Sequence, residues 1–155
     1  MDDNWDRTIF DKELKAILET KLPVSASRIT NLQALATAHP QHHNYIIQCI
    51  CRFLETAPPD YRLAGLYVID AISRSVHKKL RKREEAGDKG APLEVEGFLK
   101  RFAIVLKSDT LIGCFEPCST KDKVGKRFFF ILHILFFKNL CEQCFLFHVN
   151  RLALR

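Results

Sequence analysis

Asp70 is the acidic residue whose position most suggests chemistry, because it interrupts the apolar sequence LYVIDAIS at residues 66–73. An ionised carboxylate is costly to bury without partners, so Asp70 must meet a cation, water or a polar group of a ligand. At helical spacing Tyr67, Asp70 and Arg74 share one face, with Ser73 beside them. Two interpretations stay open. Asp70 pairs with Arg74 or a neighbouring helix, or these residues line a groove in which a ligand hydroxyl donates to the carboxylate.

A second candidate site lies in the sequence PVSASR at residues 23–28, directly before a predicted helix. The free N–H groups and the dipole of a helix N-terminus favour an anion, and Arg28 adds a planar fork of donors. Together with Ser25 and Ser27, these features predict a phosphate site. The alternative is ordinary N-capping by the Ser25 hydroxyl, which many helices show.

The cysteine spacing near the C-terminus suggests a zinc site, with C-x3-C and C-x2-C pairs at Cys114, Cys118, Cys141 and Cys144. Glu-Pro interrupts the first pair and aromatic residues surround the second, so we interpret these residues as free thiols and expect no metal and no cofactor. A zinc-stabilised structural module is the alternative. The chain carries no hydrolase, metalloprotease or nucleotide-binding signature, so we expect no enzyme activity.

The charge of the chain is unevenly distributed. There are 24 Lys and Arg against 18 Asp and Glu, and the last 32 residues alone carry a net charge of +4. Whole-chain basicity is therefore a weak argument for nucleic-acid binding. The basic run at residues 78–83 is a nuclear import signal, a polyanion contact or simply a solvated helix end, and the two acidic residues that follow it favour the last interpretation.

The N-terminal residues and the Phe-rich run at residues 128–137 indicate the cellular compartment of the protein. The first six residues include three Asp and no apolar run follows, so we expect an intracellular protein without disulfides. The run at residues 128–137 is too short to cross a bilayer, which needs about 20 apolar residues. We therefore expect no transmembrane segment.

Hydrophobic periodicity predicts an all-α fold of short antiparallel helices. Apolar residues recur at helical spacing, and prolines or a glycine-containing loop separate the segments. The predicted helices cover residues 6–20, 25–39, 45–54, 60–76 and 94–107. The fourth is apolar all round and should be central, and Gly65 within it is tolerable where a neighbouring helix approaches closely.

The sequence from Phe10 onward, above all LYVIDAISR, resembles the RNA polymerase II C-terminal-domain-interacting domain (CID) of fungal termination and RNA-processing factors. The resemblance implies a right-handed superhelical stack of helices, similar to ENTH and VHS domains, which binds phosphorylated YSPTSPS repeats. It implies that Asp70 accepts a hydrogen bond from the peptide, most simply from its tyrosine hydroxyl, with Tyr67, Ser73 and Arg74 as companions. It also implies that Ser25, Ser27 and Arg28 contact a phosphate on the serine at heptad position five.

The resemblance stops at Lys123, where VGKRFFFILHILFF replaces the expected seventh helix. We therefore expect an incomplete CID-like domain at residues 1–123 and an atypical basic tail at 124–155, which we interpret as translated intron sequence. The expected function is a nuclear, non-enzymatic module that binds the phosphorylated polymerase repeats and couples transcription to termination and RNA processing. RNA-processing proteins are further expected partners, no membrane contact is expected, and RNA contact is left open. The alternatives are an adaptor or membrane-contacting helical module, or a truncated product without function.

Overall fold

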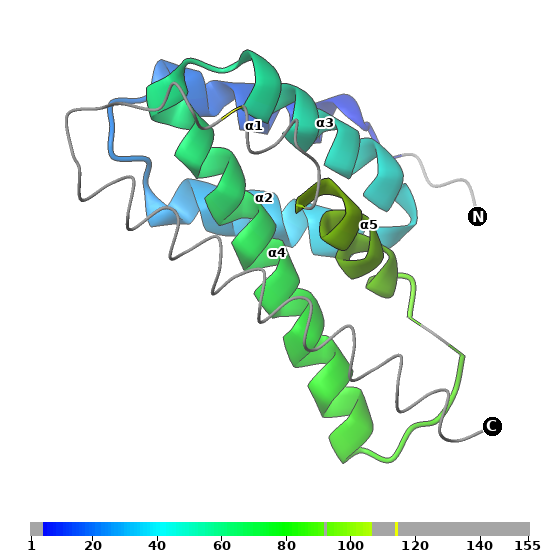
Figure 1. Cartoon of the computed structure of the whole chain (residues 1–155). Coiled ribbons are helices and arrows are strands. Elements are labelled where there is room, and N and C mark those ends of the chain that lie inside the picture. Colours follow the sequence, from blue (N-terminus) through cyan, green and yellow to red (C-terminus); the bar gives the residue numbers. More distant parts are fainter. Residues whose placement is uncertain (1–4, 92, 107–113, 115–155) are drawn as a thin grey trace.

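The computed structural model describes residues 5–91, 93–106 and 114. Within them lie five α-helices and two short 3-10 turns, and no strand (Figure 1). The all-α prediction is therefore confirmed. The elements are α1 Thr8–Lys15, η1 Ala16–Glu19, α2 Ala26–Ala38, η2 Pro40–His42, α3 His43–Thr56, α4 Pro59–Glu85 and α5 Glu96–Leu106.

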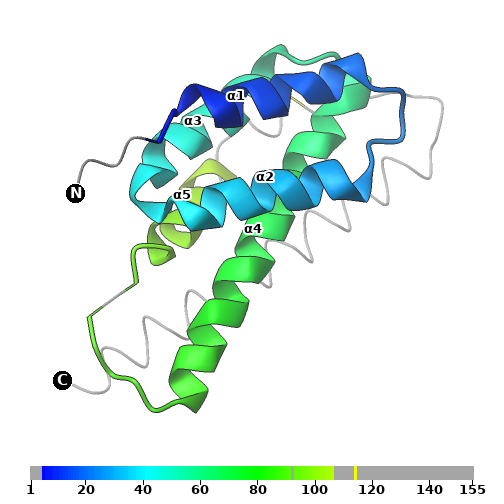
Figure 2. The same cartoon turned by 180° about the vertical axis from the view of Figure 1, so that it is seen from behind.

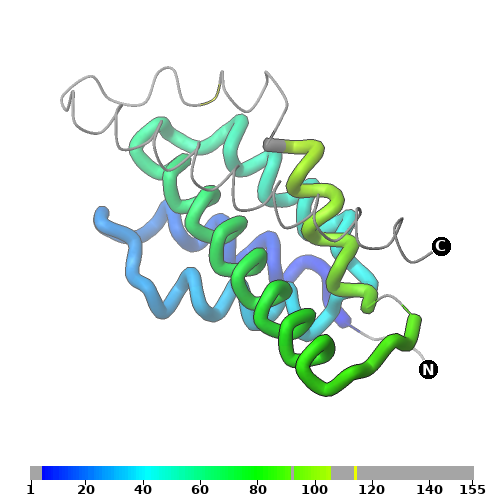
Figure 3. The backbone as a smooth tube through the Cα atoms, turned by 60° about the horizontal axis from the view of Figure 1, so that its bottom comes forward, coloured from blue at the N-terminus to red at the C-terminus, as the bar shows by residue number. Residues whose placement is uncertain are grey.

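The helices form a compact bundle around α4. Helices α1 and α2 run antiparallel (Figure 2), and α1 also packs against α3. Helix α4 lies between α2 and α5, as Figure 3 shows, and packs against α3 as well. This arrangement places α2 beside α4, so the two candidate sites predicted from the sequence belong to neighbouring helices.

One hydrophobic core holds the bundle together. Its largest fully buried side chains sit at the periodic positions that predicted the helices, which explains why each helix is amphipathic. Burying a side chain of this size stabilises a fold by about 1.5–3 kcal/mol. These residues are Phe10, Leu14, Ile17, Leu32, Ile46, Ile50, Leu54, Val68, Ile69, Ile72, Phe98 and Phe102.

Gly65 marks the closest approach of α3 and α4. A Cβ atom placed on Gly65 would lie 2.6 Å from Leu54 Cδ2 and 3.3 Å from Phe53 Cδ1. The helical cost of this glycine is therefore offset by close packing, which confirms the reason predicted for it.

Three features of the helices differ from the predictions. The first predicted helix tightens into the 3-10 turn η1 after Lys15. Helix α4 continues as regular helix to Glu85, whereas the charged sequence after residue 76 predicted a frayed helix end followed by a loop. Helix α4 is also not apolar on every side, because Tyr67, Arg74 and Lys78 are exposed. Its long polar face explains both corrections, since a charged helix end can continue into solvent without losing core contacts.

None of the described helices is long and apolar enough to span a membrane. The Phe-rich run, the predicted boundary after residue 123 and three of the four zinc-candidate cysteines (Cys118, Cys141 and Cys144) lie outside the described residues.

Candidate functional site

The Asp70 carboxylate is held by Arg74 from the next turn of α4. Arg74 Nη2 lies 2.6 Å from Asp70 Oδ2, and Arg74 Nε donates to Asp70 Oδ1 at 3.0 Å. The Asp70 side chain keeps 23% of its accessible surface and that of Arg74 keeps 78%. The pairing predicted from the sequence is confirmed, but the surroundings of Asp70 are less apolar than we expected. Asp70 lies at the surface of α4 rather than inside the bundle.

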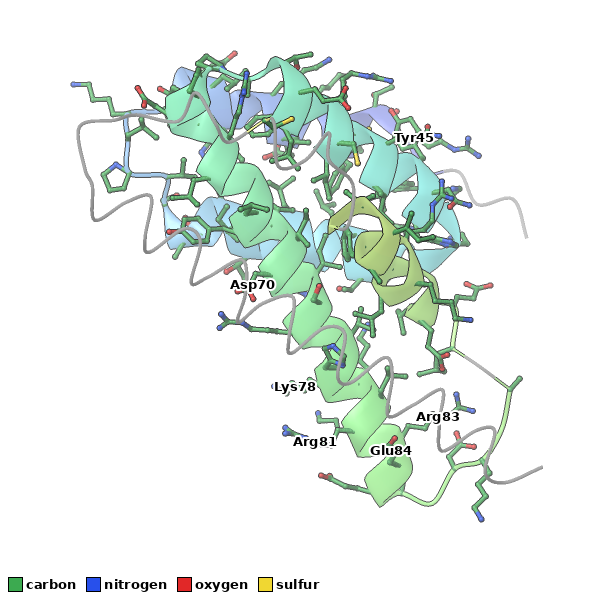
Figure 4. All side chains as sticks on the ribbon, viewed as in Figure 1. Tyr45, Asp70, Lys78, Arg81, Arg83 and Glu84 are labelled. Carbon is green, nitrogen blue, oxygen red and sulfur yellow. The ribbon has the colours of Figure 1, made fainter. Side chains whose placement is uncertain are left out.

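Tyr67 extends this polar surface by one turn toward the start of α4. It is 41% exposed, so the face of its ring is accessible to a ligand. Figure 4 shows Asp70 on the side of α4, away from α5. Tyr67, Asp70 and Arg74 therefore form one accessible surface, here called the α4 strip.

Ser73 does not join the α4 strip. It is buried, and its hydroxyl donates to the Ile69 carbonyl at 2.7 Å within the same helix. A Ser hydroxyl that bonds back to its own helix and faces the core is not available to a ligand in this arrangement. Helical spacing alone did not reveal this, because Ser73 stands at the edge of the strip, where a small side chain fits either environment.

The start of α2 carries two serine hydroxyls in contact. Ser25 Oγ lies 3.1 Å from Ser27 Oγ, and Ser25 makes no side-chain capping bond although it occupies the N-cap position with extended backbone. Ordinary capping by Ser25 is therefore wrong for this structure. The Arg28 N–H already donates to the Ser25 carbonyl at 3.2 Å, so an anion here would meet the N–H groups of Ala26 and Ser27 as well as two hydroxyls.

Arg28 stands one turn into α2 and is half-buried. Among the described residues, none of the ion pairs or hydrogen bonds involves its guanidinium group. An arginine without a carboxylate partner beside free N–H groups and hydroxyls is well suited to bind a phosphate. Ser25, Ser27 and Arg28 thus stand at the start of α2, and the phosphate site predicted for them stays a prediction.

Polar contacts fix how α2 lies on α4. Gln33 Nε2 donates to Ser75 Oγ at 3.0 Å, and Lys79 Nζ donates to the Thr37 carbonyl at 3.4 Å. From the first pair to the second, the residue number rises by four on each helix, so α2 and α4 run in the same general direction where they touch. Both contacts lie in the C-terminal half of α2, where this helix crosses α4. Sequence analysis missed this polar seam, since ordinary surface residues form it and no motif marks them.

The positive charge near the strip comes from Arg and Lys rather than from histidine. His77 follows Arg74 by one turn, and burial lowers its pKa from 6.5, so its ring is neutral at physiological pH. The charge that would attract an anion is therefore permanent in the neutral range.

The described residues provide no cluster of three metal-binding side chains. Burial raises the pKa of the Cys49, Cys51 and Cys114 thiols, which keeps them protonated at neutral pH. The Cys114 carbonyl accepts a hydrogen bond from Arg62. A separate open depression between α3 and α5 includes Cys51 and the exposed Ile104, but none of the predicted site residues lines it.

Comparison with known proteins shows to which family the chain belongs. The chain is 31% identical over 65 residues to SR-related and CTD-associated factor 8 of Homo sapiens and of Rattus norvegicus, and 29% identical over the same length to SR-related and CTD-associated factor 4 of Homo sapiens. Each alignment covers 42% of this chain but only 5–6% of the relative. No solved structure is significantly similar to the chain. The sequence profile of the CID domain matches residues 8–126, which is most of the chain, and the chain therefore belongs to the CID domain family.

Proposed function

We propose that this chain is a binding module, not an enzyme, for the phosphorylated C-terminal heptad repeats of RNA polymerase II. The observation that carries the proposal is the start of α2, where two serine hydroxyls lie in contact and Arg28 has no ion-pair partner among the described residues, on a helix that packs against the one bearing the α4 strip. The start of α2 suits a phosphate, and the α4 strip suits a peptide segment with an aromatic ring and a hydroxyl group.

Membership of the CID domain family supports this proposal. The relatives are named as factors associated with a CTD, which is a property of those proteins. Because the alignments reach only a small part of them, we transfer to this chain the binding of the polymerase tail and not their remaining activities.

Binding in this proposal uses two distinct contacts. The phosphate on the serine at heptad position five accepts hydrogen bonds from Arg28, from the serine hydroxyls and from the first N–H groups of α2. The peptide tyrosine packs near Tyr67 and donates its hydroxyl to Asp70. The two bonds from Arg74 leave lone pairs free on both Asp70 oxygens, so the carboxylate can accept this further bond.

A module of this kind would act in the nucleus, where it would bring termination and RNA-processing proteins to the transcribing polymerase. Its contacts combine a partly exposed phosphate site and one exposed aromatic ring. We therefore expect modest affinity that falls with added salt, since exposed charges are screened over about 10 Å at 0.1 M ionic strength.

The test is a fluorescence anisotropy titration of the full chain with a labelled double-repeat peptide, unphosphorylated or phosphorylated at position five. We expect the phosphorylated peptide to bind more tightly, and Arg28→Gln to remove most of this preference. Arg52→Gln is the control, because Arg52 is exposed on α3 and its substitution changes the net charge equally. Equal affinity for the two peptides would refute the phosphate role, and no binding to either peptide would refute the module.

A further inference from the structure

The last turns of α4 extend beyond the rest of the bundle and carry an unusual density of positive charge. Figures 1 and 2 show this end of the helix projecting away from α1, α2 and α3. From residue 71 to residue 83 the helix contains six Lys and Arg and no acidic residue. Such a surface repels other cations and attracts anions in proportion to how many of its charges lack partners.

Two of these cations hold α4 against neighbouring parts of the fold. Lys79 donates to the Thr37 carbonyl, and Arg83 pairs with Asp88 at 3.1 Å, with only 15% of the Arg83 side chain exposed. Both side chains therefore contribute to the fold, where they fix α4 against α2 and against the loop that follows it.

The remaining four cations form a row that is open to solvent. Lys78, Arg81 and Lys82 follow Arg74 by four, seven and eight positions, which places each of them on the Arg74 side of the helix, and Figure 4 shows Lys78 and Arg81 on the same side of α4. Among the described residues, no carboxylate lies within ion-pair distance of Lys78 or Lys82. Arg74 pairs with Asp70 at 2.6 Å and Arg81 with Glu85 at 3.8 Å, but these two arginine side chains keep 78% and 73% of their surface exposed. All four are exposed. This row, the basic ridge, consists of Arg74, Lys78, Arg81 and Lys82.

The spacing of the ridge favours one class of polyanion. At 1.5 Å per residue the ridge is about 12 Å long. A nucleic-acid strand carries a phosphate at every nucleotide, about 3.4 Å apart along a helix axis, so several phosphates fit along this length. A peptide phosphorylated once in seven residues spaces its phosphates up to about 25 Å apart, so only one would fit. A lipid surface would also require exposed apolar residues, and Val76 and Leu80 are buried.

We infer that the basic ridge binds the phosphate backbone of single-stranded RNA without reading its sequence. The ridge presents no aromatic ring or amide that could recognise a base, so contacts with phosphate alone remain. The choice of RNA rests on the proposed function, which places the chain beside a polymerase that is producing a transcript. The location and the chemistry of the ridge do not depend on that function.

The test uses the full chain and a labelled oligouridine of about 20 nucleotides, which exceeds the site size of small nucleic-acid-binding folds. We expect Lys78→Gln/Lys82→Gln to weaken binding about tenfold at low salt. We also expect it to reduce the slope of log affinity against log salt by about 1.4, or about 0.7 for each lost phosphate contact. The control is Lys12→Gln/Lys100→Gln, which removes the same charge from exposed positions on α1 and α5.

The outcomes separate the ridge from the peptide site. The inference holds if the ridge variant loses affinity for RNA, the control variant does not, and both bind the phosphorylated peptide like the original chain. It also requires that single-stranded DNA of equal length competes as well as RNA, because only the backbone is contacted. The inference is overturned if the original chain does not bind oligouridine, if both variants weaken binding equally, or if the ridge variant loses peptide affinity alone.

Discussion

Arg74 contacts both carboxylate oxygens of Asp70 across one turn of α4, with N–O distances of 2.6 and 3.0 Å. Bidentate contact fixes the plane of the carboxylate and so directs its remaining lone pairs toward solvent. Arg74 is exposed and Asp70 is partly exposed, and surface ion pairs contribute about 0–1 kcal/mol to stability. Its geometry therefore matters more for presenting an acceptor at the surface than for holding the fold together.

Asp70→Asn should weaken binding of the repeat peptide about tenfold or more and change the free energy of unfolding by less than about 1 kcal/mol. The reason is that a hydrogen bond to a charged acceptor contributes about 1.5–3 kcal/mol, whereas an exposed ion pair contributes little to the fold. Peptide titration and urea unfolding measure the two effects. Arg74→Gln keeps the carboxylate and should keep most of the affinity. Unchanged peptide affinity in Asp70→Asn would contradict the acceptor role.

The helices and the core residues could be predicted from the sequence, because the buried face of a helix carries apolar residues at regular helical spacing. Leu14, Ile50 and Phe98 are all buried where amphipathic spacing placed them. Whether an individual polar side chain faces solvent or the core could not be predicted in this way. Asp70 and Ser73 are three residues apart, yet one faces solvent and the other faces the core, a choice set by the helices that pack against α4. The contact of Gln33 with Ser75, 42 positions apart, likewise depends on tertiary packing.

Ser25→Asp should act on stability and on binding in opposite directions. Asp is a good N-cap residue, and its charge interacts favourably with the helix dipole, so α2 should be stabilised by about 0.3–1 kcal/mol. The same charge occupies the place of the phosphate and repels it. We expect a higher denaturation midpoint together with loss of the preference for the phosphorylated peptide. A variant that keeps that preference would show that the phosphate binds elsewhere.

Ser73→Ala should leave peptide affinity unchanged within twofold or so. The Ser73 hydroxyl bonds to the Ile69 carbonyl inside the helix, where the backbone ladder also supplies a donor to that carbonyl. Removing it leaves no unpaired group, so stability should change by about 0.5 kcal/mol or less. The measurement is the same peptide titration, with Asp70→Asn as the positive control. A tenfold loss of affinity would place Ser73 in the peptide site despite its burial.

His77 should make the fold less stable in mild acid. Burial lowers its pKa in the folded chain below the ordinary 6.5, so the unfolded chain binds the proton more readily. This contribution to stability is fully present above pH 6.5 and is lost as the pH falls through the folded pKa. His77→Gln should therefore flatten the pH dependence of the urea midpoint below pH 6.5. Since the other histidines remain in both proteins, a parallel pH dependence would exclude His77 as the cause.

Gly65→Ala tests the close approach of α3 and α4 on which the position of the strip depends. The added methyl would lie 2.6 Å from Leu54 Cδ2, and Leu54 is only 1% exposed, so its side chain has little room to move. Overpacking of this kind costs about 1–3 kcal/mol, and the better helix propensity of Ala returns about 1 kcal/mol. We expect a net loss of about 1 kcal/mol in the free energy of unfolding.

Leu54→Ala supplies the matched comparison for this substitution. Alone it should cost about 2–5 kcal/mol, because it leaves a cavity beside Gly65. In that background the Gly65→Ala methyl enters space that Leu54 has vacated, so the double variant should be less destabilised than the two single effects predict. A coupling of about 1 kcal/mol in this direction would be expected for residues in direct contact. Strict additivity would mean that the cost of Gly65→Ala arises within α4 itself and not from the contact with α3.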